Sequence, residues 1–395
     1  GGIPISNMLS NEKLDAIEKR VRNAGAEVVA LLKTGSAFYA ESLFPVEAVD
    51  ALRAAQLLSC CLPEDLGGRG TTVTELASVA RTMGASCSSA AMVFAMHHTQ
   101  ALTLAHHGTT GPIAELTRAI ARDESLLASA TTEITTGGDV GRSTCAVERD
   151  GDTVILEKTA PVISYGAVAD YICTTARRSP DAEPSDQVLV VCPAADTTLE
   201  QISTWDVLGF RGTCSPGFLL KTRTSAANVL PVDYSTISAS TMLPGSHTLW
   251  ASVWLGIADA ALSKARDATR AAVRNKPGAT VPQAAKLAEL TVAHQRFEAS
   301  VTRALQRYEE FLRTPDREPT VSFTITMNNL KLTASTAVIE VVLGALELIG
   351  INGYREDHPA SMGRLVRDAL GPQLMVSNDR IKANNAHLVL AQRGD

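Results

Sequence analysis

Helical spacing of apolar residues dominates the first third of the chain. It predicts helices over residues 13–33, 45–59, 74–84 and 86–107, and the last of these is so uniformly small and apolar that it indicates a buried helix. Glycine-rich breaks at Gly67-Gly68 and at Gly108 to Gly111 separate these segments. The pattern therefore predicts an N-terminal helical domain over residues 1–125.

The pattern changes at about Leu126. Short apolar runs then alternate with polar and turn residues, which is typical of strands in a small antiparallel sheet. Asp150-Gly151 between two such runs is a hairpin signal, because glycine adopts a positive φ without strain. We expect a middle antiparallel β domain over residues 126–235, with strands near 126–131, 144–147, 153–156, 171–176, 187–192 and 217–221.

Helical spacing returns from about Ser246 to the end of the chain. A second apolar stripe begins at Trp250, and Pro277-Gly278 and Pro315 fall at the expected breaks. Because helices with one apolar face pack together, residues 236–395 are predicted to form a four-helix bundle. The fold class is α+β, mainly α. The longest apolar seam consists of Leu287, Leu290, His294, Phe297, Val301, Leu305, Tyr308 and Leu312.

Composition excludes several classes of protein. The 36 Lys and Arg residues against 42 Asp and Glu residues give a net charge of −6, which argues against a nucleic-acid partner. The apolar stretch 337–351 is interrupted by Glu340 and Glu347 and is too short to span a bilayer, so no membrane partner is expected. Seven scattered cysteines without C-x-x-C spacing argue against disulfides and a zinc site, and favour a reducing cytoplasm.

One polar segment stands out at the start of the β domain. Ala130-Thr131-Thr132-Glu133 leads to Gly137-Gly138-Asp139 and offers hydroxyls, backbone N–H groups and two adjacent glycines. Such a loop can bring the backbone close to a polar cofactor or a phosphate. An ordinary β turn explains the same residues, and neither a G-x-G-x-x-G nor a P-loop is present.

Six short segments follow one another along nearly the whole chain. They are Pro63-Glu64 with Gly67-Gly68, Thr132-Glu133 with Gly138-Asp139, Val162-Ile163-Ser164, Leu208-Gly209-Phe210-Arg211, Leu348 to Tyr354, and Arg367-Asp368. Together these segments resemble the acyl-CoA dehydrogenase family of flavoproteins, which carries similar segments in the same order. The resemblance implies an N-terminal helical domain, a middle β domain and a C-terminal four-helix bundle.

The resemblance implies FAD as the cofactor and a homotetramer or homodimer as the assembly. By position, Thr131 and Thr132 would approach the pyrimidine side of the flavin and Ser164 its N5. Gly138 stands where the family has serine, and Val162 where it has a tryptophan that packs on the flavin. Residues near the part of FAD contributed across subunits would be Glu347, Asn352 and Gly353, with Arg274 near the diphosphate.

The catalytic position departs from the family. The usual base is a Glu about nine residues after Arg-Asp, and this chain has Val376 there. A second family position for the Glu, near Gly245-Ser246-His247, holds no carboxylate either. The dehydrogenase reaction needs a base to remove an α proton while hydride leaves for the flavin.

Two residues are candidates for the missing base. His247 follows Leu243-Pro244 and is competent near neutral pH, although packing against Trp250 explains it equally well. Asp379 precedes Arg380 and is also explained as a helix cap. The pairs His97-His98 and His106-His107 lack partners at ligand spacing, so no metal site is expected.

Three hypotheses remain open. The first is a FAD-dependent oxidoreductase that desaturates an acyl thioester and passes electrons to an external acceptor. The second is a flavin-dependent monooxygenase on the same scaffold, in which reduced flavin reacts with oxygen and no α proton is removed. The third is a non-catalytic flavin-binding homologue, which the lost tryptophan and the altered segment around Arg274 favour.

Overall fold

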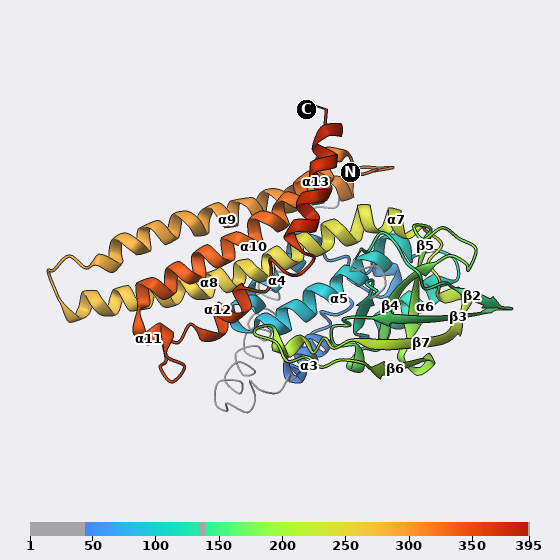
Figure 1. Ribbon diagram of the computed structural model, residues 1–395, viewed down its shortest axis with the longest axis horizontal. Helices are drawn as coiled ribbons and strands as arrows, with labels where there is room; N and C mark the ends of the chain where they lie inside the picture. The colour runs from blue at the N-terminus through green and yellow to red at the C-terminus, as the bar shows by residue number, and fades with distance from the viewer. Residues whose placement is uncertain (1–43, 134–138, 394–395) are drawn as a thin grey trace. The chain divides into compact units, whose positions relative to one another are not determined.

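The computed structural model describes residues 44–133 and 139–393 (Figure 1). The helix predicted over residues 13–33 and the candidate residue Gly138 lie outside the described residues. The chain divides into two compact units. The described part of the first comprises residues 44–76, Val93–Asp206 and Arg211–Ser246, and that of the second comprises Ala77–Met92, Val207–Phe210 and residues 247–393. The domain boundaries expected at residues 125 and 235 stay a prediction.

Helices form the N-terminal part, as the apolar spacing predicts. They are α3 (Val46–Ala54), α4 (Val73–Ser86), α5 (Ser88–His107) and α6 (Ile113–Asp123). Helix α5 is buried along most of its length, which confirms the prediction from its composition. Helix α3 ends earlier than predicted, because Gln56 adopts a left-handed backbone conformation with φ 57° that a helix cannot contain.

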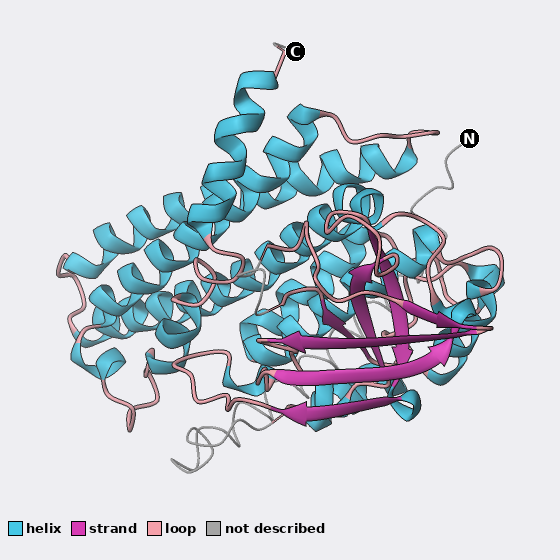
Figure 2. Cartoon of the chain, turned by 45° about the vertical axis from the view of Figure 1, so that its right-hand side comes forward, coloured by secondary structure: helices cyan, strands magenta, loops and turns pink. Residues whose placement is uncertain are grey.

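The middle part forms two small sheets, both in the first unit. The three-stranded sheet has the order β1-β4-β5, and the four-stranded sheet has the order β2-β3-β7-β6. Figure 2 shows the strands of one sheet running across those of the other. The strands are β1 (Leu127–Ala130), β2 (Glu148–Asp150), β3 (Thr153–Ala160), β4 (Tyr171–Arg177), β5 (Gln187–Pro193), β6 (Thr197–Gln201) and β7 (Phe218–Ser225).

The hairpin predicted at Asp150-Gly151 joins β2 to β3, and Gly151 has the positive φ of 61° that the turn requires. The expectation of purely antiparallel pairing is wrong for one pair, since β1 runs parallel to β4. These two strands are distant in the sequence and are joined by a crossover through the other sheet, so no turn signal could specify their direction.

The second unit is a helical bundle. Its long helices are α8 (Leu243–Asn275), which begins in the first unit, α9 (Pro282–Arg313) and α10 (Val321–Ile349), and the shorter helix α13 (Asn378–Ala391) packs on α10. Figure 1 shows α9 lying along α10. The predicted seam of α9 is buried from Leu290 to Tyr308, which confirms that interpretation. Two short helices, α11 (Ile351–Tyr354) and α12 (Gly363–Ala369), connect α10 to α13.

Helix α10 is the most apolar of the long helices. Within the described part of the chain it alone is long and apolar enough, by length and composition, to cross a membrane. It also packs on α9 and α13 and buries Ala334, Val338 and Val342. A core helix of a bundle meets the same criteria, so this one helix is weak evidence for a membrane span.

Candidate functional site

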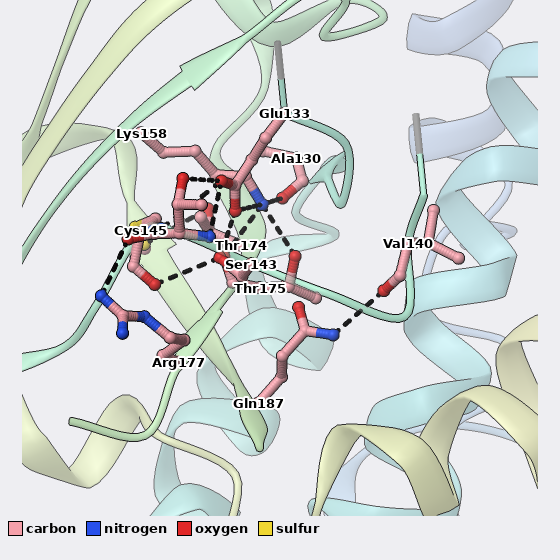
Figure 3. Close-up of polar contacts among 12 residues, drawn as sticks. Ala130, Glu133, Val140, Ser143, Cys145, Lys158, Thr174, Thr175, Arg177 and Gln187 are labelled. Carbon is pink, nitrogen blue, oxygen red and sulfur yellow. Dashed lines mark hydrogen bonds and ion pairs between the residues drawn. The ribbon is translucent and has the colours of Figure 1, made fainter. Parts of the chain in front are cut away.

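A buried lysine joins the two sheets of the first unit. The core-facing positions of β3 are Val154, Leu156, Lys158 and Ala160, so strand alternation turns Lys158 inward, and its side chain is 0% exposed. Its Nζ donates hydrogen bonds to the carbonyl oxygens of Ala130 and Thr175, each at 2.9 Å, and to Thr175 Oγ1 at 2.7 Å (Figure 3). All three donors of the ammonium group therefore have acceptors.

The carboxylate of Glu133 completes this cluster. Its Oε1 lies 3.5 Å from Lys158 Nζ and accepts a hydrogen bond from Ser143 Oγ. Its Oε2 accepts from the backbone N–H of Thr144 at 3.0 Å and from Thr144 Oγ1 at 2.9 Å. Burial alone would raise the pKa of Glu133, but the Ser143 hydrogen bond and the charge of Lys158 outweigh it and hold the pKa below its ordinary value.

Burial acts in the opposite direction on the cation. It lowers the pKa of Lys158 to about 8, although the charge of Glu133 raises it. The pair is therefore charged on both sides at neutral pH, with the ammonium group close to its titration range. Neighbouring thiols do not share that range, because burial raises the pKa of Cys145 to about 12 and that of Cys192 to about 11.

Residues 139–145, after Glu133 in the chain, are fixed by further bonds. Val140 O accepts from Gln187 Nε2 at 3.0 Å, and Ser143 N–H donates to Pro184 O at 2.9 Å. Thr144 O accepts from Arg177 Nη2 at 3.2 Å. Thr131 and Thr132, the predicted cofactor-binding residues, follow directly on Ala130 and are half-buried. Their hydroxyls make no hydrogen bond to another residue of the described chain.

Ser164, the third predicted flavin contact, ends a row of hydroxyl groups. Ser215 Oγ donates to Ser164 Oγ at 2.8 Å, and Thr213 Oγ1 lies 2.8 Å from Ser215 Oγ. Because Ser164 Oγ accepts here, its own O–H is free to donate away from the row. The neighbouring residues Tyr165 and Cys214 have positive φ values of 43° and 45°, a strained conformation for residues other than glycine.

Backbone bonds keep this turn in place. Tyr165 N–H donates to Thr213 O at 2.8 Å, and Tyr165 Oη donates to Leu127 O in β1 at 2.6 Å. Val162, which stands where the resemblance places a flavin-packing tryptophan, is 42% exposed. The first unit thus brings Ser164 into one hydroxyl row and anchors the segments on either side of Thr131 and Thr132.

The two candidate bases both lie in the second unit. His247 is buried in α8, and its Nδ1 lies 3.0 Å from Met327 O, so Nδ1 carries the hydrogen. Burial lowers the pKa of His247 to about 4, which makes it a weak proton acceptor. Asp379 is exposed in the first turn of α13, where a carboxylate also suits the helix dipole.

Val376 lies in a fixed turn before α13. It is 43% exposed, and its backbone has a φ of 49°. The carbonyl oxygens of Pro372 and Val376 and the side chain of Asn378 all accept hydrogen bonds from Lys331 Nζ, at 2.7–2.9 Å. Lys331 is buried in α10, and burial lowers its pKa to about 8. These hydrogen bonds hold the turn in place, and the resemblance of Val376 to the family's carboxylate position stays a prediction.

Two of the resembling segments contact each other in the second unit. Asp368 accepts a hydrogen bond from Phe210 N–H at 2.7 Å and another from Ser88 Oγ. A Cβ atom at Gly209 would lie 2.4 Å from Arg367 O, so only glycine fits there. The Leu208-Gly209-Phe210 segment therefore packs directly on Arg367-Asp368.

The residues predicted near the remainder of FAD are spread over the second unit. Arg274 is exposed in the last turn of α8. Glu347 is exposed near the end of α10 and pairs with Lys286 at 2.8 Å. Asn352, exposed, and Gly353, buried, lie in α11. Their roles toward FAD stay predictions.

The histidine pairs have structural partners. His97 Nε2 donates to Leu58 O at 2.6 Å while its Nδ1 accepts from Leu127 N–H at 3.0 Å. His98 Nε2 donates to Leu57 O at 2.7 Å, and its Nδ1 lies 3.4 Å from Cys61 Sγ. Across residues 44–133 and 139–393, no group of His, Cys, Asp or Glu could hold a metal ion.

Sequence reasoning missed the two buried lysines, although each had a signal. Lys158 occupies a core-facing position of an alternating strand, and Lys331 lies on the buried face of the most apolar helix. A lysine at such a position is fully buried only when it is paired.

Comparison with known proteins identifies the class. The model described as acyl-CoA dehydrogenase, N-terminal domain, matches residues 11–124, and that of the acyl-CoA dehydrogenase, C-terminal domain, matches residues 238–383. The chain belongs to the acyl-CoA dehydrogenase family. It is 26% identical over 347 residues to cyclohex-1-ene-1-carbonyl-CoA dehydrogenase of Geobacter metallireducens, a match that covers 86% of this chain and 88% of that protein.

Among solved structures, FMN-bound TdsC of Paenibacillus sp. A11-2, a dibenzothiophene monooxygenase, has the same fold. The TM-score is 0.82 at 19% identity, with 98% of each chain covered. A local match of 53% identity over 51 residues relates 13% of the chain to malate dehydrogenase of Chlorobium phaeobacteroides. The chain spans only 16% of that protein's length.

Proposed function

We propose that this chain is a flavin-dependent oxidoreductase. The observation that carries the proposal is the set of available hydroxyl donors at the positions where the family contacts flavin. Ser164 keeps its O–H free because it accepts from Ser215, and Thr131 and Thr132 are half-buried with hydroxyls unbonded to other described residues. Carbonyl and ring-nitrogen acceptors of an isoalloxazine suit such donors. The residues present therefore fit a flavin.

A bound flavin would supply the redox chemistry, namely hydride or electron transfer at the isoalloxazine. The residues of this chain would bind and orient it. Thr131 and Thr132 would donate to the pyrimidine side, and Ser164 would donate near N5, with Ser215 fixing its rotamer. Val162, which is exposed, would offer the flavin an aliphatic side chain in place of the family's aromatic ring.

Of the two reactions, we propose oxygen-dependent monooxygenation ahead of acyl desaturation. Desaturation requires a base for the α proton. Val376 cannot accept a proton, His247 is a weak acceptor with its pKa near 4, and Asp379 is an exposed residue of a helix start. A reaction in which oxygen is the partner needs none of these. The FMN-bound monooxygenase TdsC shares the fold over nearly the full chain, so the fold is compatible with this choice.

Desaturation of an acyl thioester is the second candidate. The 26% identity to a CoA dehydrogenase over most of both chains favours it. In that reaction His247 would be the base and an external acceptor would reoxidise the flavin. FAD and FMN carry the same reactive ring, so either flavin satisfies the proposal.

Titration of the purified chain with FAD and with FMN tests the flavin proposal directly. Quenching of flavin fluorescence with a saturable Kd supports it, and the absence of binding for both flavins contradicts it. Reduced flavin and oxygen are then supplied with candidate aromatic or thioester substrates, with oxygen consumption and product mass as readouts. Substrate-dependent insertion of one oxygen atom from O2 supports monooxygenation.

We further propose a homotetramer or homodimer. The family resemblance supports it, and the second unit exposes large apolar side chains that a subunit contact could cover. These include Ile351, Tyr354, Leu374, Val389 and Leu390. Light scattering after size exclusion tests the assembly, and a mass of one chain over a range of concentrations would contradict it.

A further inference from the structure

Lys158 and Glu133 touch both sides of the predicted flavin-contact segment. On the incoming side, Lys158 holds Ala130 O, the last residue of β1 before Thr131. On the outgoing side, Glu133 holds Ser143 and the backbone N–H of Thr144. Lys158 and Glu133 are joined to each other at 3.5 Å, and their side chains are 0% and 4% exposed.

We propose that Lys158 and Glu133 act as one positioning pair that fixes residues 130–133 and 139–145 and thereby sets how tightly Thr131 and Thr132 hold a flavin. The effect on flavin rests on the proposed function, whereas the fixing of the backbone does not. Neither residue contacts the flavin itself. They act through the backbone that carries the two threonines.

The geometry supports a positioning role beyond general stability. Lys158 comes from β3 in the four-stranded sheet, while its acceptors Ala130 and Thr175 belong to β1 and β4 of the other sheet. An apolar residue would fill the space but would remove the Lys158 donor from the carbonyl oxygens of Ala130 and Thr175 and the positive charge from beside the Glu133 carboxylate. A buried charge left alone by the loss of its partner destabilises its surroundings, whereas removal of both charges costs much less.

Three variants distinguish a positioning role of the pair from a general effect on stability: Lys158→Met, Glu133→Gln and the double variant. In unliganded protein, we expect Lys158→Met to raise amide hydrogen exchange at least tenfold in peptides covering 127–133 and 139–147. The double variant should recover much of the lost thermal stability but keep the weakened flavin binding, with Kd raised at least tenfold. If the pair only stabilised the fold, the flavin Kd of the double variant would return toward the wild-type value together with its thermal stability.

Lys331→Met is the matched control. Lys331 is also fully buried and also serves three oxygen acceptors, but in the turn of residues 372–378. Its loss should raise exchange in that turn and leave peptides 127–133 and 139–147 at their wild-type rates. Equal loosening of those peptides in both lysine variants would overturn the proposal.

The pH profile gives a second readout. Lys158 faces Glu133, Cys145 and Cys192, and of these groups Lys158 is the one with a pKa near 8. Loss of its charge removes the cation from beside the Glu133 carboxylate, which keeps only its hydrogen-bond donors, so the wild-type Kd for flavin should rise several-fold between pH 7 and 9. The double variant should show no such inflection.

The outcomes are distinct. If wild-type protein binds neither FAD nor FMN, the proposed function fails, while the exchange measurement still decides whether the pair fixes the backbone. If wild type binds flavin and Lys158→Met shows wild-type exchange and a Kd within twofold of wild type, the positioning pair is wrong.

Discussion

The ε-amino group of Lys331 donates a hydrogen bond of 2.9 Å to the carbonyl oxygen of Val376. A buried cation on the core helix of the bundle thus fixes the backbone of Val376, where the resemblance places the family's catalytic carboxylate. The turn is anchored by these hydrogen bonds, and the valine side chain on it cannot accept a proton. This combination is the main reason for preferring a reaction without α-proton removal.

Lys331→Met should strongly destabilise the second unit. The change leaves the acceptors Pro372 O, Val376 O and Asn378 Oδ1 without their buried donor, which costs about 2–4 kcal/mol of unfolding free energy. Urea unfolding measures it. Lys286→Met, which removes an exposed lysine, is the control and should unfold at the wild-type midpoint. Equal urea midpoints for both variants would show that the hydrogen bonds of Lys331 do not stabilise the second unit.

Acid should destabilise the protein before its carboxylates titrate. Burial lowers the pKa of His97 and His247 to about 4 from an ordinary 6.5, and it lowers that of His98 as well. Between pH 6.5 and 4 the unfolded chain therefore binds more protons than the folded one, so the free energy of unfolding falls as the pH drops. The loss reaches about 3 kcal/mol each for His97 and His247 at pH 4.

The pH dependence of urea unfolding checks this. His247→Gln lacks the titrating group, so its stability should fall less steeply than that of wild type between pH 6.5 and 4. A slope identical to that of wild type would show that His247 is not buried in its neutral form.

A polar network in the second unit should also lose stability when one of its charges is removed. Arg81 Nε donates to Asp259 Oδ2 at 2.7 Å, and His294 Nε2 lies 2.6 Å from Asp259 Oδ1. Asp259→Asn removes the charge that both partners face and should cost about 3 kcal/mol. Thermal unfolding measures it, with the exposed Arg296–Glu340 pair as control. Glu340→Gln should leave Tm unchanged. If Glu340→Gln lowered Tm as much as Asp259→Asn, the Asp259 network would not be a special source of stability.

The hydroxyl row makes a prediction about flavin affinity. Ser164→Ala removes the outward donor and should raise the flavin Kd about three- to tenfold, the worth of one hydrogen bond. Ser215→Ala should have a smaller effect, because it only frees the Ser164 rotamer. Ser225→Ala, an exposed serine at the end of β7, should bind as wild type does. If Ser164→Ala keeps the wild-type Kd, Ser164 is not a flavin contact.

Local patterns in the sequence predicted much of the fold. The Asp150-Gly151 hairpin and the buried seam of α9 rest on turn chemistry and helical spacing, which neighbouring residues determine. Strand β6 (Thr197–Gln201) escaped prediction because it is a polar edge strand paired only with β7. The parallel β1–β4 pair depends on contacts between distant segments, which no local pattern encodes.

Residues of the candidate site could be predicted from the sequence only in the segments that resemble the acyl-CoA dehydrogenase family. Thr131, Thr132 and Ser164 were named from motifs, whereas the bonds that hold them come from residues far away in the sequence. Lys158 lies 25 or more residues from the segment it anchors, and only the register of β3 turns it toward that segment. The reducing compartment remains a prediction, since seven free cysteines are compatible with it but do not demonstrate it.

We propose that the turn at Val376 does not support proton abstraction, although the chain binds a flavin. The most direct test is anaerobic mixing of flavin-loaded protein with a panel of acyl-CoA thioesters, for wild type and for Val376→Glu. We predict that the flavin absorbance of wild type persists with every thioester, and that Val376→Glu is bleached by at least one. Rapid bleaching of the wild-type flavin by an acyl-CoA would contradict the claim.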